Sequence, residues 1–357
     1  GVNEFVMPMT SRKYSNRAAL ELLTTPQSIF CAIIRDIQRA RRVIDMEFYI
    51  FEEDNVGRAF VELLLRKARQ GVAVRMLLDG FGSRNVSRRT LGRLIASGVD
   101  VRTSQFVSNC RNHRKIVVVD DSVAYTGGVN IADRYVSGNH LGLWHDVVLR
   151  ISGGAVQGLS RILEYDSLLM EGVNSELVVR SDSRVALYAS EMQGGRAMQL
   201  LLRSIAESAH NQIVITTPYL FPSSDMLKLL ASAVKRGVVV RVVVPTRSDV
   251  AVLDAMMPKY VAEAMDVGID VRQVAGAFVH AKMAIVDAES VVVGSANLDA
   301  RSLRLNRELM VVTDDSGVCS AACKFVESLC AESTPAKPIP RVGLISRLLA
   351  RVLSPLL

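Results

Sequence analysis

The stretch that decides the fold is NHRKIVVVDDSVAYTGGVN, residues 112–130, because it recurs as VHAKMAIVDAESVVVGSAN at residues 279–297. His, Lys, Asp, Gly and Asn occupy matching places in the two copies, at one constant separation along the chain. Chance agreement of five residue types at one separation is rare, of the order of about one in ten thousand. We therefore predict an internal duplication, in which two copies of one ancestral unit form two lobes.

The segments around each copy follow one order of elements. Residues 43–51 (VIDMEFYIF) are typical of a strand, residues 56–71 have apolar residues at helical spacing, and residues 72–79 (VAVRMLLD) are again typical of a strand. The second half repeats this order in residues 213–221, 224–237 and 238–245. This alternation predicts an α/β fold of two similar lobes in a pseudo-twofold arrangement. Each lobe is expected to hold a mixed, largely buried sheet flanked by helices, with the active site at the lobe interface.

Composition and length fit a globular protein with large cores. The chain has 357 residues, of which 49% are hydrophobic and 22% charged. No run reaches the roughly eighteen apolar residues of a membrane-spanning helix. The net charge of +7 favours anionic partners, either phospholipid surfaces or nucleic acid. The five cysteines lack the spacing of a metal site, so reduced thiols and no metal are expected.

A polar stretch without sustained periodicity, residues 171–186, indicates the lobe boundary. We predict an N-terminal lobe over residues 1–175 with the first motif, a C-terminal lobe over 176–332 with the second, and a linker and amphipathic helix over 333–357. The apolar residues near the end form one helical face, with Arg347 and Arg351 away from it. Such a basic amphipathic helix suits a membrane interface, although docking on the protein's own core explains it equally well.

The His-x-Lys pair in each copy is suited to phosphate chemistry. Side chains two residues apart on a strand share a face, so His113 and Lys115 enter one cleft, as do His280 and Lys282. An ammonium group neutralises phosphate oxygens while an imidazole acts as nucleophile or acid. A lone histidine is more often structural, but the duplication favours catalysis shared between two histidines across the interface.

The remaining motif residues have both functional and structural interpretations. We include Asp120 and Asp287 in the catalytic set because they belong to the motif, although Asp at the end of a strand commonly organises a turn, and this support role is the one we favour. Asn130 and Asn297 follow turns that contain glycine, and their amides are predicted to donate to phosphate oxygens.

These motifs resemble the signature of the phospholipase D superfamily, a duplicated His-x-Lys-x-x-x-x-Asp followed by Gly-Gly or Gly-Ser and Asn. The resemblance covers nearly the whole chain. It implies a covalent phosphohistidine intermediate, no cofactor, no metal in the chemical step, and an active site built by both lobes. By motif position His113 is the nucleophile and His280 the general acid and then base. The symmetry of the sequence leaves the reverse assignment open.

The superfamily also places an acidic residue downstream of each motif, where it orients a histidine. Asp146 in LWHDVVLR and Glu308 in LNRELMVV occupy these places, with ordinary charge at the edge of a strand as the alternative. The two copies differ at one position of the motif. Gly128 stands where the second copy has Ser295, so a hydroxyl donor is expected in only one half of the site.

Several segments are similar to the bacterial cardiolipin synthases, among them FYIFEEDNVGRAF, LLDGFGS, GGVNIADRY and LLARVLSPLL. This resemblance implies transfer of a phosphatidyl group from one phosphatidylglycerol to the hydroxyl of another, giving cardiolipin and glycerol. It also implies anionic phospholipids as partners and a place at the bacterial cytoplasmic membrane. Attachment is expected to be peripheral, possibly through residues 341–357, or through segments absent from this chain.

Three alternatives remain at this point. A phospholipase D-type hydrolase shares the covalent step and differs only in letting water resolve the intermediate. A nuclease of the same superfamily fits the positive charge, but aromatic residues are only 5% of the chain and none interleave with a basic stretch, so nucleic acid is not expected as a partner. A non-catalytic lipid-binding protein is disfavoured because both motifs are intact.

Overall fold

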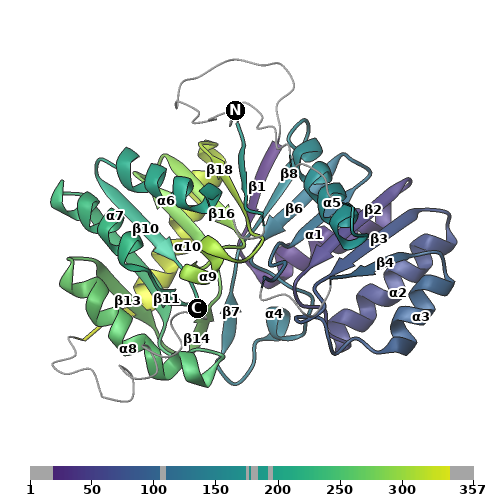
Figure 1. Cartoon of the computed structure of the whole chain (residues 1–357), viewed down its shortest axis with the longest axis horizontal. Helices are drawn as coiled ribbons and strands as arrows, with labels where there is room; N and C mark the ends of the chain where they lie inside the picture. The colour runs from purple at the N-terminus through teal and green to yellow at the C-terminus, as the bar shows by residue number, and fades with distance from the viewer. Residues whose placement is uncertain (1–18, 105–109, 174–176, 178–183, 192–195, 338–357) are drawn as a thin grey trace.

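Two β-sheets placed side by side form the frame of the molecule (Figure 1). The computed structural model describes residues 19–104, 110–173, 177, 184–191 and 196–337 of the chain. A seven-stranded sheet comes from the first half of the sequence and an eight-stranded sheet from the second. The predicted α/β fold with two similar lobes is confirmed.

The first lobe has the strand order β1-β8-β6-β5-β2-β3-β4. Strands β2, β3 and β4 run parallel, and the others are antiparallel to their neighbours. The strands are β1 (Ala19–Leu23), β2 (Val43–Phe48), β3 (Ala73–Leu78), β4 (Asp100–Thr103), β5 (Ile116–Val119), β6 (Val123–Gly127) and β8 (Val148–Ser152). The helices are α1 (Pro26–Arg39), α2 (Asn55–Arg69), α3 (Arg88–Ala96), α4 (Arg134–Ser137) and α5 (Val156–Met170).

The second lobe repeats this order as β9-β18-β16-β15-β10-β12-β13 and adds β19 at the far edge. Its strands are β9 (Ala186–Ala189), β10 (Gln212–Thr216), β12 (Val239–Pro245), β13 (Asp270–Val274), β15 (Met283–Val286), β16 (Ser290–Gly294), β18 (Leu309–Thr313) and β19 (Ser333–Pro335). Its helices are α6 (Arg196–Ser208), α7 (Ser224–Lys235), α8 (Ala251–Asp266), α9 (Ala300–Arg304) and α10 (Ser316–Glu332). A short parallel pair, β11 (Leu220–Phe221) and β17 (Leu298–Asp299), lies beside this sheet.

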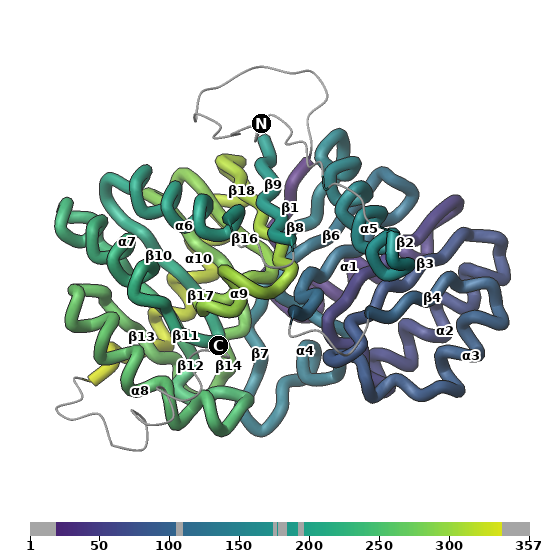
Figure 2. The backbone as a smooth tube through the Cα atoms, in the orientation of Figure 1, coloured from purple at the N-terminus to yellow at the C-terminus, as the bar shows by residue number. Residues whose placement is uncertain are grey.

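Three hydrophobic cores hold these layers. One lies between the first sheet and α1–α3, and another lies between the second sheet and α6–α8. The third is shared by both lobes, because it contains residues of both sheets together with α5 and α10, for example Leu159 and Phe325. Figure 2 shows the two lobes as a purple-to-teal half and a green-to-yellow half that meet along a central seam. The shared core makes the two lobes one packed body.

The seam is also crossed by backbone pairing. Strand β7 (Leu143–His145) of the first half pairs in parallel with β14 (Ala277–Val279) of the second. On the other side of the pseudo-twofold axis, Asn112 forms a bridge with Arg307. Both crossings lie next to a motif histidine, so packing of the lobes positions the site.

The duplicated motifs form the central hairpins β5–β6 and β15–β16, which are almost wholly buried. Both turns begin with consecutive residues in the left-handed region, Asp120 and Asp121 at φ 51° and 52° and Asp287 and Ala288 at φ 52° and 59°. A pair of left-handed residues fits the right-handed twist of a tight hairpin, and Asp tolerates this region better than most residues.

The predicted linker begins within the second sheet. Residues 333–335, assigned to the linker, form β19 and pair with β13, so they belong to the second sheet. The boundary between residues 175 and 176 and the predicted helix over 341–357 lie outside the described residues. Among the helices of the described part of the chain, none is long and apolar enough to cross a bilayer.

Candidate active site

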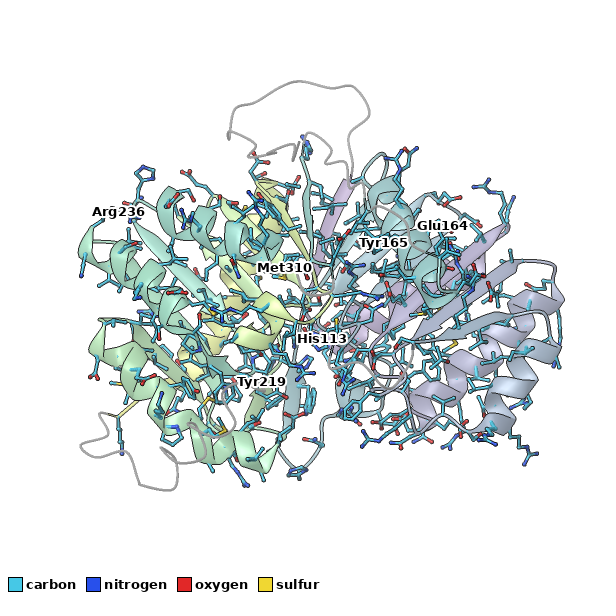
Figure 3. All side chains as sticks on the ribbon, in the orientation of Figure 1. His113, Glu164, Tyr165, Tyr219, Arg236 and Met310 are labelled. Carbon is cyan, nitrogen blue, oxygen red and sulfur yellow. The ribbon has the colours of Figure 1, made fainter. Side chains whose placement is uncertain are left out.

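Both motif histidines stand just before the first strand of their hairpin, at the seam between the lobes, where Figure 3 labels His113. The backbone N–H of His113 donates to the carbonyl of Arg307 in the other lobe at 2.9 Å. The N–H of His280 donates to the carbonyl of His145 at 2.8 Å. Each histidine is therefore held by the backbone of the opposite lobe.

The carboxylates cross the seam in the same way. Nδ1 of His280 lies 2.6 Å from Oδ2 of Asp146, which comes from the first lobe. Nδ1 of His113 lies 3.1 Å from both carboxylate oxygens of Glu308, which comes from the second lobe. A carboxylate at Nδ1 fixes the tautomer that leaves the Nε2 lone pair free. Each lobe thus supplies one histidine and orients the histidine of the other.

The two motif lysines are buried beside these histidines. Nζ of Lys282 donates to the carbonyl of His280 at 2.5 Å and lies 3.0 Å from both ring nitrogens. Nζ of Lys115 donates to the carbonyl of His113. Burial lowers the pKa of Lys115 to about 7 and that of Lys282 to about 8. The charge of each lysine also lowers the pKa of the histidine in the opposite lobe.

Electrostatics set the protonation state of the free site. Burial lowers the pKa of both histidines, that of His280 to about 3 with the help of Lys282. Burial opposes ionisation of Glu308, but His113, Lys115 and a hydrogen bond from Ser295 bring its pKa to about 2. At neutral pH the free site therefore holds neutral imidazoles, with His113 beside the ionised carboxylate of Glu308.

Gly128 and Ser295 fit different carboxylates. The hydroxyl of Ser295 donates to Oε2 of Glu308 at 2.5 Å. A Cβ at Gly128 would lie 2.2 Å from Oδ1 of Asp146, so the carboxylate occupies the space that a side chain would need. The first copy, whose acid is Asp146, therefore has no side chain at this position. The second copy, whose acid is Glu308, has the hydroxyl donor of Ser295.

The walls around the two histidines also differ. The ring of Tyr49 meets His113 edge-on, with centroids 4.9 Å apart. His280 lies between Trp144 and Tyr135, with ring centroids at 5.1 and 5.3 Å. The His280 half is therefore the more aromatic one.

Positive charge gathers near His113. Burial and the charge of Asp79 raise the pKa of Tyr49, which packs on that histidine, while the charges of Arg111, Arg301 and Arg84 oppose the rise. The positive charges of three arginines and the negative charge of one aspartate therefore act on the ring of Tyr49.

Negative charge gathers on the other side. The hydroxyl of Tyr219 donates to Asp249 at 2.5 Å, and burial together with that carboxylate raises the tyrosine's pKa. The charges of Asp249 and Asp299 also act on Lys282, where they oppose the effect of burial. The same half also holds one arginine, because the guanidinium of Arg134 lies 5.4 and 5.6 Å from the ring centroids of Tyr135 and Trp144. The two halves of the site thus share a plan and differ in the charged side chains around them.

Comparison with known proteins agrees with this geometry. The family model described as cardiolipin synthase, phospholipase D-like domain, matches residues 33–147 and 202–329. The chain belongs to this family. It is 32% identical to the probable cardiolipin synthase YwiE of Bacillus subtilis, over 91% of the chain and 68% of that protein. It is 33% identical to cardiolipin synthase A of Pseudomonas aeruginosa, over 98% of the chain and 75% of that protein.

A solved structure shares the fold. The phosphatidylserine synthase of Haemophilus influenzae superposes with a TM-score of 0.78, covering 93% of this chain and 92% of that one at 15% identity. At that identity the likeness concerns the fold alone. Membership of the cardiolipin synthase family rests on the sequence matches.

Asp120 and Asp287, placed in the predicted catalytic set, do not reach the histidines. Each follows the strand whose other end carries the histidine, and a strand of four residues spans about 13 Å. The carboxylate of Asp120 accepts backbone N–H groups of residues 41–43 at 2.7–2.9 Å. That of Asp287 accepts those of residues 210–212 at 2.7–2.8 Å. Both organise the start of a neighbouring strand, which matches the support role that we favoured.

The two motif asparagines also serve the protein's own groups. Oδ1 of Asn130 accepts the N–H of Ile50 at 3.0 Å, and its amide donates to the hydroxyl of Tyr135 at 2.7 Å. The side chain of Asn297 lies near Asp299, whose pKa it helps to lower against the effect of burial. The contacts of Asn130 do not favour direct donation to phosphate oxygens, whereas for Asn297 such donation stays a prediction. Asn130 acts on the site through Tyr135, which packs on His280.

Sequence reasoning missed a buried ion cluster beneath the histidines. The guanidinium of Arg114 donates to Asp166 and, at 2.7 Å, to the carbonyl of Ser190, and Arg307 contacts Asp166 at 3.3 Å. This cluster ties α5 to both lobes. Arg114 and Arg307 are each adjacent in sequence to a site residue, so the two arginines could have been suspected. Nothing in the sequence indicates that Asp166, in the middle of a helix, is buried.

Aromatic walls were missed as well. One of these walls is Tyr49, which lies against His113. Tyr135 and Trp144 gave no signal because α4 and β7 reach His280 only through packing of the lobes. Within the described ranges no group of three or more His, Cys, Asp or Glu side chains is placed to hold a metal ion.

Proposed function

We propose that this chain catalyses phosphatidyl transfer as a cardiolipin synthase, joining two phosphatidylglycerol molecules into cardiolipin and releasing glycerol. The observation that carries this proposal is the pair of histidines, each oriented by a carboxylate of the opposite lobe and each beside a buried lysine. Two oriented imidazoles on one phosphate allow attack and leaving-group protonation to be divided between them. Family membership supports the choice of a phospholipid as substrate.

In the first step, Nε2 of His113 attacks phosphorus and the bond to the headgroup glycerol oxygen breaks. His280 gives its proton to that oxygen, and glycerol leaves. Lys115 and Lys282 neutralise the non-bridging oxygens as charge builds on them. The products are a phosphatidyl group bound to His113, a neutral His280 and free glycerol.

Charge balance explains how His280 obtains its proton. The free site places two lysines beside two carboxylates, and Lys115, with a pKa of about 7, is only partly protonated at neutral pH. A phosphodiester adds one negative charge. This charge favours uptake of one proton, and His280, held at 2.6 Å from Asp146, is placed to receive it.

In the second step, the hydroxyl of another phosphatidylglycerol attacks phosphorus while His280 accepts its proton. The bond between phosphorus and His113 breaks, and the histidine returns to its neutral state. Water in place of the alcohol would give phosphatidic acid. The hydrolase is therefore the second candidate, and both share every residue named above.

The charge distribution supports His113 as the nucleophile. Three arginine charges reach Tyr49, which packs on His113. On the His280 side one arginine, Arg134, acts on Tyr135, while the charges of Asp249 and Asp299 act on Lys282. An anionic diester is attracted toward the more positive half, so the phosphorus lies nearer His113.

Contact with a membrane surface is part of the same proposal, because phosphatidylglycerol resides in bilayers. The predicted basic amphipathic helix over 341–357 is one means of attachment. A bacterial cytoplasmic membrane is the place that this implies.

The test is to incubate the protein with phosphatidylglycerol vesicles, without added metal, and to resolve the lipid products by mass spectrometry. Cardiolipin and free glycerol, absent with His113→Ala, are expected. Phosphatidic acid alone would replace the synthase with the hydrolase. Absence of any lipid product would overturn both and turn attention to nucleic acid, for which a salt titration of DNA binding is the next measurement.

A further inference from the structure

Four large aliphatic side chains are exposed around the half of the site that contains His280. They are Val136, Leu143, Val250 and Val252, with exposed fractions of 38%, 58%, 40% and 39%. We propose that these four residues, called here the apolar rim, dock the protein on a phospholipid bilayer so that the cleft opens toward the lipid. The proposal rests on the proposed function in one respect, that the substrate is a membrane lipid.

The first half of the rim adjoins the walls of the site directly. Val136 follows Tyr135, and Leu143 precedes Trp144. The rings of Tyr135 and Trp144 lie 4.9 Å apart, and both contact the ring of His280. Each of these two apolar residues is therefore one position along the backbone from a side chain that touches the histidine.

The segment that carries Leu143 is rigid. Asn139 and Gly142 exchange backbone hydrogen bonds of 3.0 and 2.9 Å, and Nε1 of Trp144 donates to Oδ1 of Asn139 at 3.1 Å. Leu143 itself lies in β7, paired opposite Ala277 of the other lobe. The exposed position of this leucine is thus fixed by strand pairing, as a permanent docking contact requires.

The second half of the rim lies at the start of α8. Val250 follows Asp249, whose carboxylate accepts the hydroxyl of Tyr219 at 2.5 Å. Asp249 also lies close enough to Tyr135 for its charge to raise the pKa of that tyrosine in addition to burial. The α4–β7 segment and α8 both lie along the lower edge of the molecule in Figure 1. The two halves of the rim therefore lie on the same edge of the molecule, near Tyr135.

Isolated exposed aliphatic residues are ordinary on protein surfaces. These four differ because they come from two segments far apart in sequence, residues 136–143 and 250–252, that lie on one edge of the molecule on the His280 side of the site. Ile95 on α3 and Val239 at the start of β12 have exposed fractions of 57% and 54%, but lie on elements that carry none of the rim residues. They provide matched controls.

Charge on the rim is mixed. Arg134 pairs with Glu52 at 2.7 Å, Arg247 lies 3.8 Å from Asp254, and Asp249 is exposed. Attraction to an anionic surface is therefore weak at this place, and insertion of apolar side chains is the main contribution. Binding through the rim is expected to depend little on salt, whereas binding through a basic helix falls steeply as salt rises.

The experiment compares Leu143→Asp/Val252→Asp with Ile95→Asp/Val239→Asp in the full chain. Co-sedimentation with phosphatidylglycerol vesicles and turnover are measured, the latter on vesicles and on a short-chain phosphatidylglycerol dispersed as monomers. The rim variant is expected to lose about tenfold or more in binding and in vesicle turnover, because two charges replace inserted apolar groups. Its turnover of the short-chain lipid stays within about twofold of the unmodified protein, and the control variant changes neither.

Unchanged vesicle binding by the rim variant would overturn the proposal, as would equal losses in rim and control variants. A parallel loss on monomeric lipid would show damage to the site, and Leu143→Ser, which introduces no charge, then decides between damage and docking by the same vesicle-to-monomer ratio. If the unmodified protein turns over neither lipid, the proposed function fails. Co-sedimentation of the two variants still tests the rim in that case.

Discussion

The two ends of the duplicated motif differ in how far the copies have diverged. At the aspartate end, Asp120 and Asp287 have nearly the same φ angle, and each accepts three successive backbone N–H groups. At the histidine end the copies differ in the acid, its support and the aromatic walls. The backbone requirement of a tight hairpin is the same in both lobes, whereas a displacement on phosphorus needs two unequal partners. The duplication keeps what folding needs and changes what the chemistry needs.

The divergence at the histidine end is concentrated in one short segment. In LWHD and LNRE, Trp144 stands where Asn306 stands, and Asp146 where Glu308 stands. Trp144 packs on His280, whereas Asn306 donates to Glu308 at 3.3 Å. His280 therefore has an aromatic neighbour at this position. Glu308, the acid of His113, has an additional hydrogen-bond donor instead.

The largest difference between the two halves of the site is expected when the two histidines are replaced separately. His113→Ala and His280→Ala are each expected to lower turnover of phosphatidylglycerol by about 10³-fold or more. With a phosphatidyl ester of p-nitrophenol, whose leaving group needs no proton, His280→Ala regains a burst of p-nitrophenolate and a trapped phosphohistidine, whereas His113→Ala does not. The burst is read by absorbance and the intermediate by mass spectrometry. A burst of p-nitrophenolate in His113→Ala instead of His280→Ala would make His280 the nucleophile and His113 the general acid.

Exchange of the small residues beside the acids tests the next difference. Gly128→Ala places a methyl group where Asp146 sits, so His280 loses its partner and kcat/KM falls by about 10²-fold. Ser295→Ala removes only one of several hydrogen bonds to Glu308, and a fall of about tenfold is expected. Gly92→Ala, a position with no atom within 4 Å of the added Cβ, is the control and stays active. Equal activity of the two alanine variants at the site would contradict the fit described for Gly128.

The pH dependence sharpens the comparison between the lysines. Because their pKa values are about 7 for Lys115 and about 8 for Lys282, kcat/KM is expected to fall by about tenfold per pH unit between 7 and 8 and more steeply above 8, as the phosphate loses first one cation and then the other. Lys115→Arg keeps a positive charge and moves the fall toward 8. The free energy of unfolding changes in the opposite direction. Lys115 in the unfolded chain, with a pKa of 10.5, binds more protons than in the folded chain, so this free energy rises between about pH 7 and pH 10.5. Kinetics and urea midpoints over this range check both signs.

The smallest effects are expected where the lobes are most alike. Asp120→Ala and Asp287→Ala should each lower the free energy of unfolding by about 1–3 kcal/mol, through loss of three backbone hydrogen bonds to a carboxylate. kcat per folded molecule should stay unchanged, because neither side chain reaches the histidines. Urea unfolding with active-site titration provides both numbers. A loss of kcat without a loss of stability would restore these residues to the catalytic set.

Much of this arrangement could be predicted from the sequence because the signals are local. The alternation of strands and helices, the hairpin turns and the pairing of His113 with Lys115 depend on residues within one segment. The duplication then indicates that the second histidine pair meets the first. Membership of the family followed from the same motifs.

The rest depends on how the lobes meet, which local patterns do not encode. Sequence places Asp146 after the motif that contains His113, yet the structure gives it to His280, because β7 pairs with β14 of the other lobe. The wall formed by Trp144 follows from the same crossing. The aspartates were grouped with the histidines because motif spacing does not reveal that β5 and β15 separate them.

The crossed carboxylates carry a consequence for ancestry. A single unit with one motif would hold a histidine whose acid points away from it and an acid whose histidine is missing. Such a unit could complete a site only by pairing with a second copy of itself, as the two copies do within this chain. Because the copies are joined, each side can carry its own substitutions, which identical subunits cannot.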